Sequence, residues 1–294
     1  MKHINEIEKG KEILSKSGII ICAIVRDCEK GLKRNLPVIN SICDISKDYH
    51  VVIFENDSID KTKQILEAWS LKKKNIHILS ESYKTQTIPA KTQCGEINPS
   101  FSEARISKMA LYRNKYLSYI EENKLEGDYV IIVDLDVFSI SLNGILSSFG
   151  FENDWDAITA NGISRSFSSM FRKRYYDTYA LFECGLENVP QTEKIIKKNQ
   201  YQWAFMKNKM PLIPVVSAFG GLGIYKKKAI EGCRYGVLFN DDVNVQCRTE
   251  HYHLYQEMKK KGYSRIFINP SMSIKYQTQV VNTVRRIVKS LLKK

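Results

Sequence analysis

The residues with the strongest chemical signal are two aspartates, Asp134 and Asp136, which follow the apolar segment at 128–133. Side chains at positions i and i+2 of an extended segment point to the same side, so these two carboxylates would lie close together. A divalent cation, Mn²⁺ or Mg²⁺, relieves their repulsion and can bridge a diphosphate. A solvated acidic turn is the alternative, but the position at the end of a predicted strand favours a metal site.

Three further segments carry residues suited to a ligand. Asp57 follows a second apolar segment, where an acid can accept from ribose hydroxyls, although an Asx turn before a helix fits equally well. The guanidinium groups of Arg105 and Arg113 suit phosphate, with a solvated basic face as the alternative. Gly220 and Gly221 allow a ligand to approach the backbone closely, and they fit a hairpin turn or bulge equally well.

Acids late in the chain are candidates for the base that accepts a proton from an attacking hydroxyl. Glu250 begins a predicted helix, and Asp241 and Asp242 precede it. His251 can complete a metal site or contact a phosphate. Because His251 and His253 are two residues apart on a helix, only one of them is expected to reach the site. A helix-start acid beside a hydrogen-bonded histidine is the alternative.

The elements that position these residues alternate between strands and helices. Apolar runs predict buried strands at 18–25, 50–54, 76–79 and 128–133. Helical patterns follow the first strand to about residue 43 and recur at 62–71, 107–123 and 250–261. This order predicts a doubly wound, mostly parallel sheet in one α/β domain over residues 1–277. Because ligands bind at the carboxyl ends of such strands, we expect Arg26, Asp57 and Asp134 to converge.

Composition narrows the class of protein. The 294 residues, 43% of them hydrophobic, suffice for the core of one large domain. Lys and Arg total 45 against 32 Asp and Glu, which indicates an anionic partner such as a nucleic acid, a membrane surface or a phosphorylated substrate. The seven scattered cysteines predict reduced thiols, several of them buried, in a cytoplasmic protein. The apolar run at 18–25 is too short to span a bilayer.

Residues 278–294 have a helical pattern of their own. One stripe is apolar: Val280, Val281, Val284, Ile287, Val288, Leu291 and Leu292. Basic residues lie beside or opposite it: Arg285, Arg286, Lys289, Lys293 and Lys294. A basic amphipathic helix can lie in a membrane interface and attract anionic lipid, which predicts peripheral contact with the inner face of the membrane. A helix that caps the core or forms a dimer contact is the alternative.

The motifs follow one another in an order that resembles a known family. The series comprises Arg26, Glu55–Ser58, Arg113-Asn114, Val133–Asp136, Asp154–Ala157, Asn161-Gly162, Tyr176-Asp177, Ala180-Leu181, Ser217–Gly221 and Glu250-His251. It resembles the fungal capsule-associated α-1,3-mannosyltransferases and their bacterial relatives among the GT-A glycosyltransferases, over about residues 18–276. The chain departs from the family pattern at Phe182-Glu183, where an arginine is expected after Leu181.

The resemblance implies a GT-A fold and a metal-dependent hexosyltransferase, with mannose as one possible sugar. The donor would be a GDP- or UDP-sugar, and the acceptor a hydroxyl of a surface glycan, free or lipid-linked, of the capsule or lipooligosaccharide type. The metal would be Mn²⁺ or Mg²⁺, held on the donor diphosphate by Asp134 and Asp136. Retention or inversion of configuration stays open.

The resemblance also implies roles for other positions. The residues at the nucleoside would be Arg26 and Asp57, and Arg113 would lie near the phosphates or the sugar. The donor sugar would be bordered by Tyr176, Asp177, Gly220 and Gly221. The acceptor or the metal would be bordered by Glu250 and His251.

A nucleic-acid-binding or nucleotide-processing protein is the alternative function. The net charge agrees with it, and aromatic and basic residues interleave at 165–179, a pattern that suits single-strand binding. The sequence contains no recognised nucleic-acid motif. We therefore expect a transferase with no nucleic-acid partner.

Overall fold

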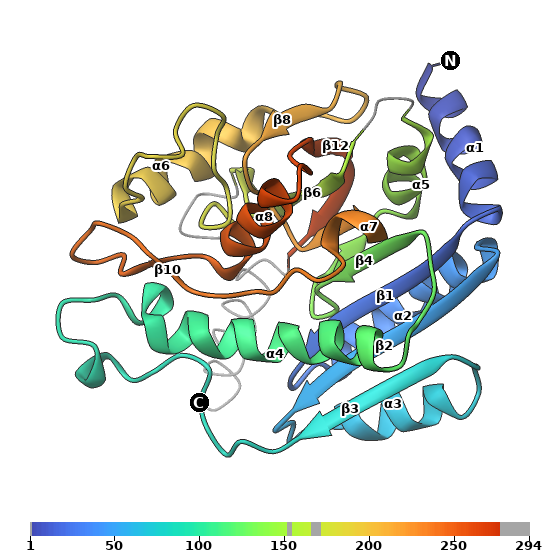
Figure 1. Cartoon of the computed structure of the whole chain (residues 1–294), viewed down its shortest axis with the longest axis horizontal. Helices are drawn as coiled ribbons and strands as arrows, with labels where there is room; N and C mark the ends of the chain where they lie inside the picture. The colour runs from blue at the N-terminus through green and yellow to red at the C-terminus, as the bar shows by residue number, and fades with distance from the viewer. Residues whose placement is uncertain (1, 152–154, 166–171, 277–294) are drawn as a thin grey trace, which may run out of the picture.

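The apolar, β-branched segment Gly18–Val25 forms β1, which lies in the middle of the parallel part of the sheet (Figure 1). The computed structural model describes residues 2–151, 155–165 and 172–276. Strand β1 pairs in parallel with β2 (Asp48–Asn56) and β4 (Tyr129–Val133), and β2 pairs in parallel with β3 (Ile76–Glu81). The four strands predicted for the first half of the chain are therefore confirmed, and β2 and β3 extend further than predicted.

The second half of the sheet is mixed. Strand β9 (Leu222–Lys226) runs antiparallel between β4 and β6 (Ala157–Ser164), and β12 (Ile266–Lys275) pairs in parallel with β6. Three short antiparallel strands complete it: β5 (Ser139–Ile140) and β8 (Ile213–Val215) on β12, and β7 (Arg174–Tyr175) on β6. The prediction of a mostly parallel sheet is therefore wrong.

The reason lies at the start of β9. The Gly221 carbonyl accepts a hydrogen bond from the Asp134 N–H, so the chain enters β9 at the carboxyl end of β4. From that end the chain can only run back along β4. A parallel strand would need a crossover connection to the opposite edge of the sheet.

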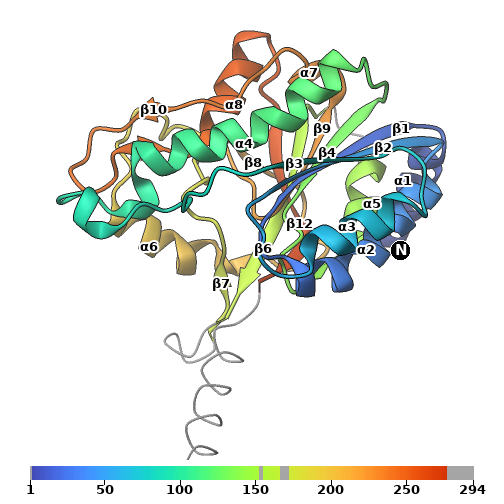
Figure 2. The same cartoon turned by 90° about the horizontal axis from the view of Figure 1, so that it is seen from below.

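Helices cover both faces of the sheet, as a doubly wound arrangement requires (Figure 2). One face carries α1 (Lys2–Ser15), α2 (Glu29–Ile45), α3 (Thr62–Ser70) and α5 (Leu142–Gly150). The other carries α4 (Glu103–Glu122), α7 (Lys227–Ile230) and α8 (Glu250–Lys260). Alternate strand residues divide between the two cores: Ile19 and Ile21 face α2, whereas Ile20 and Cys22 face α4.

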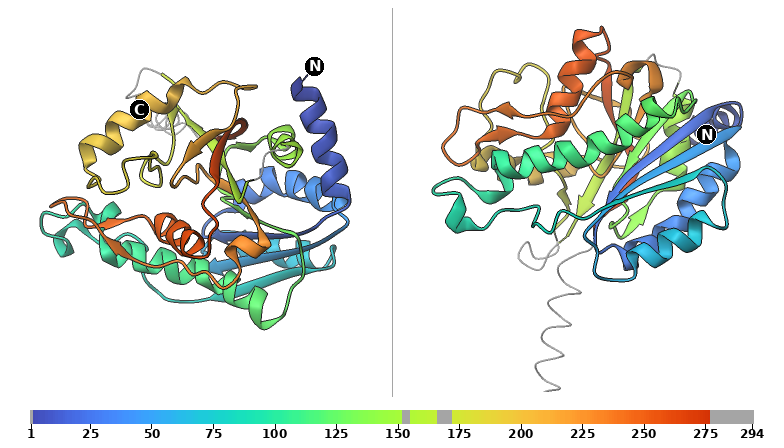
Figure 3. Two further views of the ribbon diagram at one scale, coloured as in Figure 1. Left: turned by 45° about the horizontal axis from the view of Figure 1, so that its top comes forward. Right: turned by 60° about the horizontal axis from the view of Figure 1, so that its bottom comes forward.

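Irregular segments surround the far end of the sheet (Figure 3). They contain α6 (Glu193–Gln202), the hairpin of β10 (Leu238–Phe239) and β11 (Cys247–Arg248), and the 3₁₀ turns Lys91–Gln93, Pro99–Phe101 and Trp203–Phe205. Five of the seven cysteines are buried, as predicted, and all seven are free. In the described ranges, no helix is both long and apolar enough to cross a membrane. The predicted helix at 278–294, and residues 166–171 of the basic and aromatic segment, lie outside the described residues.

Helix α2 fixes the loop that carries Asp134 and Asp136. Gly31 faces this loop so closely that a Cβ atom there would overlap the Leu135 carbonyl oxygen and lie 2.7 Å from the Asp136 Cα. Asn35, only 1% exposed, donates from Nδ2 to the carbonyl oxygens of Leu135 and Val137, both at 2.9 Å. The backbone of the loop is therefore held by a helix side chain rather than by water.

We predict that Asn35→Ala lowers the free energy of unfolding by about 1–3 kcal/mol, because it leaves buried carbonyl groups without a donor. Urea unfolding followed by circular dichroism measures the change. Ser41→Ala in the same helix is the control, since this hydroxyl bonds only the Pro37 carbonyl one turn earlier, near the surface. Equal stability of the Asn35→Ala variant and the wild type would contradict the proposed support of the loop.

Candidate functional site

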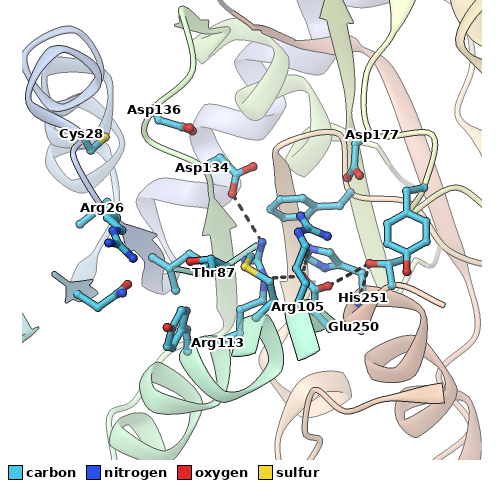
Figure 4. Close-up of a pocket in the computed structure, with 18 of the residues that line it drawn as sticks. Arg26, Cys28, Thr87, Arg105, Arg113, Asp134, Asp136, Asp177, Glu250 and His251 are labelled. Carbon is cyan, nitrogen blue, oxygen red and sulfur yellow. Dashed lines mark hydrogen bonds and ion pairs between the residues drawn. The ribbon is translucent and has the colours of Figure 1, made fainter. Parts of the chain in front are cut away.

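A pocket of about 270 Å³ opens at the carboxyl ends of the parallel strands (Figure 4). Arg26 after β1, Asn56 at the end of β2, and Asp134 and Asp136 after β4 line it. Helices α4 and α8 close the opposite wall, with Tyr112, Arg113, Glu250 and His251 among the lining residues. The expected convergence of the strand ends is confirmed, with Asn56 in the position where Asp57 was expected.

Arg113 is the charged centre of the pocket wall. Its side chain is 4% exposed; Nε donates to Glu250 Oε1 at 3.0 Å, and Nη2 lies 3.7 Å from Asp134 Oδ1 (Figure 4). The guanidinium packs over the Phe219 ring at 5.0 Å from its centroid. Within the described part of the chain, the buried Nη1 has no hydrogen-bond partner. A buried donor without a partner costs about 1–3 kcal/mol, which a ligand oxygen at this position would recover.

Asp134 and Asp136 supply the carboxylates of a cation site. Burial raises the pKa of Asp134 to about 7, and the opposing effect of Arg113 is smaller. The Tyr276 hydroxyl donates to Asp134 Oδ2 at 3.1 Å, while Asp136 is exposed to solvent. A carboxylate that is costly to ionise, next to a second one, fits a divalent cation that takes its other ligands from phosphate and water.

His251 lies in the same pocket wall, but it does not form a three-ligand metal cluster with the other described residues. The described residues contain no group of three or more His, Cys, Asp or Glu side chains placed to hold a metal. The ring stacks on Phe219 at 4.0 Å between centroids, and neither ring nitrogen has a hydrogen-bond partner in the described ranges. Burial and the charge of Arg113 lower the pKa of His251 to about 3, so the imidazole is neutral near pH 7. Its predicted role as a metal ligand stays a prediction.

Glu250 is buried against Arg113 at the start of α8. Burial alone would raise the pKa of Glu250, but the positive charges next to it lower that pKa to about 2. The charge of His251 contributes most to this lowering, followed by the charges of Arg113 and Arg105, and Arg113 is the one that donates a hydrogen bond to the carboxylate. A carboxylate with so low a pKa is a weak proton acceptor. The observed contact of Glu250 is to position Arg113, and its predicted role as a base stays a prediction.

Asp177 lies on the third side of the pocket, beside the glycine turn. Burial, followed by the charges of Asp134 and Glu250, raises the pKa of Asp177 to about 7. Its Oδ2 accepts from the Gly220 N–H at 3.3 Å. Gly220 and Gly221 have positive φ angles of 62° and 94°, and a Cβ atom at Gly220 would overlap the Ala160 carbonyl oxygen. The turn therefore requires glycine at this position.

The remaining predicted residues lie at or beyond the rim. Arg26 lines the pocket and its Nη1 donates to the Thr85 carbonyl at 2.8 Å. Asp57 does not line it, but its Oδ2 lies 4.0 Å from Arg26 Nη1, so the structure brings these two predicted residues together. Asp57 Oδ1 accepts from the Ser82 hydroxyl and from two backbone N–H groups of the loop that follows, and it thereby organises that loop. Asp241 and Asp242 lie outside the pocket, in the turn between β10 and β11. The structure does not bring these two acids to Asp134.

Some pocket residues gave no signal in the sequence. Tyr276 follows directly after β12 and more than 140 positions after Asp134, yet its hydroxyl forms a hydrogen bond with this pocket residue. Its ring stacks on Tyr176 with centroids 3.3 Å apart. Thr87 and Thr249 also line the pocket. Only the pairing of β12 beside β6 brings Tyr276 there, and a sequence pattern does not encode that pairing.

The sequence matches the family model described as cryptococcal mannosyltransferase 1 over residues 18–261. This match confirms the resemblance that the ordered motifs indicated. No curated protein matches the chain.

Solved structures of several glycosyltransferases share parts of the fold. S. aureus TarS 1–349 is 15% identical with a TM-score of 0.48, over 88% of this chain and 60% of that one. The mannosyltransferase PcManGT from Pyrobaculum calidifontis, in complex with GDP-Man and Mn²⁺, is 12% identical with a TM-score of 0.45, over 93% and 65%. The glucosyl-3-phosphoglycerate synthase of Mycobacterium tuberculosis, in complex with Mn²⁺, UDP and phosphoglyceric acid, is 10% identical with a TM-score of 0.45, over 98% and 81%.

At such TM-scores these likenesses assign no activity. The chain spans 60% of the TarS 1–349 chain and 65% of PcManGT.

We predict that Asp177 makes the protein less stable as the pH rises. The folded protein keeps a proton on Asp177 up to about pH 7, whereas the unfolded chain releases it near pH 3.8. Between these values the folded state binds more protons, so stability falls as the pH rises. The substitution Asp177→Asn should remove this loss of stability. Asparagine tolerates the left-handed backbone conformation at this position, where φ is 64°.

Urea unfolding of both proteins between pH 4.5 and pH 8 measures the effect. The stability of Asp177→Asn relative to wild type should rise by about 1–3 kcal/mol across this range, at about 1.4 kcal/mol per unit of pKa shift. Asp241→Asn, which removes an exposed carboxylate, controls for the loss of one negative charge. A difference between wild type and Asp177→Asn that stays constant with pH would be evidence against a raised pKa.

Proposed function

The chain belongs to the cryptococcal mannosyltransferase 1 family, and from this premise we propose that it is a GT-A glycosyltransferase. It transfers a sugar from a nucleoside-diphosphate donor, a GDP- or UDP-sugar, to a hydroxyl of a surface glycan. The observation that carries this proposal is the buried Arg113 guanidinium, which lines one pocket with the Asp134 and Asp136 carboxylates and has its Nη2 3.7 Å from Asp134. A cationic donor and two acids on one pocket wall suit a metal-bound diphosphate.

The residues divide between the parts of the donor. Asp134 and Asp136 would hold Mn²⁺ or Mg²⁺, which supplies positive charge to the leaving diphosphate. Arg113 donates to a phosphate oxygen from Nη1, and Glu250 keeps the guanidinium in place. Arg26 and Asn56, at the ends of β1 and β2, border the nucleoside. Because the family model is described as a mannosyltransferase, GDP-mannose is the first donor to test.

Asp177 is the carboxylate best suited to accept the proton in an inverting transfer. It lines the pocket together with Asp134, and its pKa of about 7 matches the requirement of a base that works near neutral pH. Glu250 is less suited, because the charges of His251, Arg113 and Arg105 lower its pKa to about 2. In this assignment Glu250 is a positioning residue and Asp177 takes the acceptor proton.

The enzyme works in the cytoplasm, at the inner face of the membrane, on a lipid-linked glycan. The basic amphipathic pattern of residues 278–294 supports this part of the proposal. Tyr276, which precedes this segment, contacts Asp134 through its hydroxyl.

The decisive experiment is a panel of GDP, UDP and CMP sugars with and without Mn²⁺, read by thermal shift and calorimetry. We predict that one nucleotide family raises the melting temperature only with the metal, because the carboxylate pair and Arg113 need the metal–diphosphate unit. In Asp136→Ala this metal-dependent affinity should fall at least tenfold, while Asp241→Ala outside the pocket keeps it. No binding by folded wild-type protein would refute the transferase proposal.

We predict different kinetic losses for the two acids. Asp177→Asn should lower kcat by about 10²–10⁴ with donor affinity unchanged, because a general base acts only in the chemical step. Glu250→Gln should weaken donor binding, because Arg113 loses its charged partner. Steady-state kinetics with calorimetry of the donor separate the two effects. Full turnover in Asp177→Asn would move the base elsewhere, and unchanged donor affinity in Glu250→Gln would remove its positioning role.

A further inference from the structure

Tyr276, directly after β12, is held in place by its backbone, its ring and its hydroxyl. The backbone N–H donates to the Ile163 carbonyl of β6 at 2.9 Å. The ring stacks on Tyr176, with 3.3 Å between the centroids and 22° between the planes. The hydroxyl lies so close to Gly221 that a Cβ atom at Gly221 would overlap it. The position of the hydroxyl is therefore fixed by contacts with several separate segments of the chain.

This hydroxyl orients the Asp134 carboxylate. It donates to Asp134 Oδ2 at 3.1 Å, while Oδ1 faces Arg113 Nη2 at 3.7 Å (Figure 4). The Asp134 backbone N–H donates to the Gly221 carbonyl at 2.9 Å. Asp134 is thus held through its backbone and through both oxygens of its side chain, which leaves the carboxylate plane little freedom to rotate.

The contribution of Tyr276 is orientation rather than charge. A phenol carries no charge near pH 7, whereas the guanidinium of Arg113 is always positive. Tyr276 lines the adjoining cavity of about 540 Å³ and not the donor pocket. Its influence on a ligand of the donor pocket would therefore pass through Asp134. Hydrogen bonds that orient a metal-binding carboxylate contribute about 10–100-fold to metal affinity.

We propose that Tyr276 is a positioning residue for the cation site: its hydroxyl holds Asp134 in the orientation that receives a divalent cation, and the stacking on Tyr176 holds the hydroxyl. The inference rests on the proposed transferase function. It adds a residue that the donor does not touch, yet on which the affinity of the donor site for its metal depends.

Calorimetric titration of Mn²⁺ into the nucleotide-free protein tests the role of the hydroxyl. Tyr276→Phe removes the hydroxyl and keeps the ring that stacks on Tyr176. We expect the dissociation constant for Mn²⁺ to rise about 10–100-fold. Asp136→Ala, measured in parallel, shows that the titrated Mn²⁺ binds at the carboxylate pair. An unchanged affinity in Tyr276→Phe would overturn the proposal.

Tyr119→Phe is the matched control. The Tyr119 hydroxyl also lies 3.1 Å from a hydrogen-bond partner, His77 Nδ1, and Tyr119 lines neither of the two cavities. This variant should bind Mn²⁺ as tightly as the wild type. An equal loss of affinity in the two variants would show a general effect of removing a hydroxyl and would overturn the assignment to Tyr276.

Cation preference separates orientation of the site from a loss of folded protein. Displacement of Mn²⁺ by Mg²⁺ and by Ca²⁺ is measured in the wild type and in Tyr276→Phe. Mg²⁺ demands a near-ideal arrangement of oxygens, whereas Ca²⁺ accepts a flexible one. We therefore expect Tyr276→Phe to lose more affinity for Mg²⁺ than for Ca²⁺. The same loss for both cations is the result of partial unfolding, and it would overturn the positioning role.

Repeating the Mn²⁺ titrations with GDP and with UDP lets the two proposals fail separately. If the wild type binds a nucleotide and Tyr276→Phe binds Mn²⁺ equally well, only the role of Tyr276 is refuted. If the affinity for Mn²⁺ depends on Tyr276 but neither nucleotide binds, only the transferase function is refuted. A wild-type protein that binds no Mn²⁺, with or without nucleotide, would overturn the positioning role together with the metal site.

Discussion

The site depends on one buried guanidinium. Arg113 reaches from α4 into the space between two acids, Glu250 of α8 and Asp134 after β4, and its guanidinium lies within 4 Å of both carboxylates. Without it, two carboxylates would face each other in a poorly solvated wall, at a cost of several kcal/mol. Its charge also lowers the pKa of His251, after burial, and the pKa of Glu250, after the charge of His251. Arg113 therefore joins α4 to α8 through its contact with Glu250 and also supplies positive charge to the pocket wall.

The strands and helices were largely predictable because their patterns are local. The apolar run Gly18–Val25 coincides with β1, and the helix predicted at 250–261 is α8 (Glu250–Lys260). The orientation of β9 was not predictable, since it depends on the contact between Gly221 and the Asp134 backbone, which are 87 positions apart in the sequence. Helix α5 was missed: Leu142, Ile145, Leu146 and Phe149 have helical spacing, but the helix is only nine residues long and Gly144 interrupts it. Tertiary contacts decide such elements, and a window of sequence does not contain them.

The sequence predicted those site residues whose charged side chains come directly after a predicted strand. The ends of β1 and β4 indicated Arg26, Asp134 and Asp136, the affinity of guanidinium for phosphate indicated Arg113, and the family pattern added Asp177; the structure places all five in one pocket. What the sequence lacks is the environment that assigns a chemical property to each acid. The pKa of Asp177 is raised to about 7 by burial and by neighbouring carboxylates, whereas the charges of His251, Arg113 and Arg105 lower that of Glu250 to about 2. That difference arises from distances and burial, which no residue type carries by itself.

The raised pKa of Asp177 links the two halves of the proposed reaction. After burial, the charge of Asp134 contributes most to this increase. Whatever balances the charge on Asp134 therefore lowers the pKa of Asp177 and favours loss of its proton. Donor binding at Asp134 and Asp136 would be such a change, because it brings positive charge to these carboxylates. Asp177 would then become an effective base only after the donor is in place, which would couple activation of the acceptor to occupancy of the donor pocket.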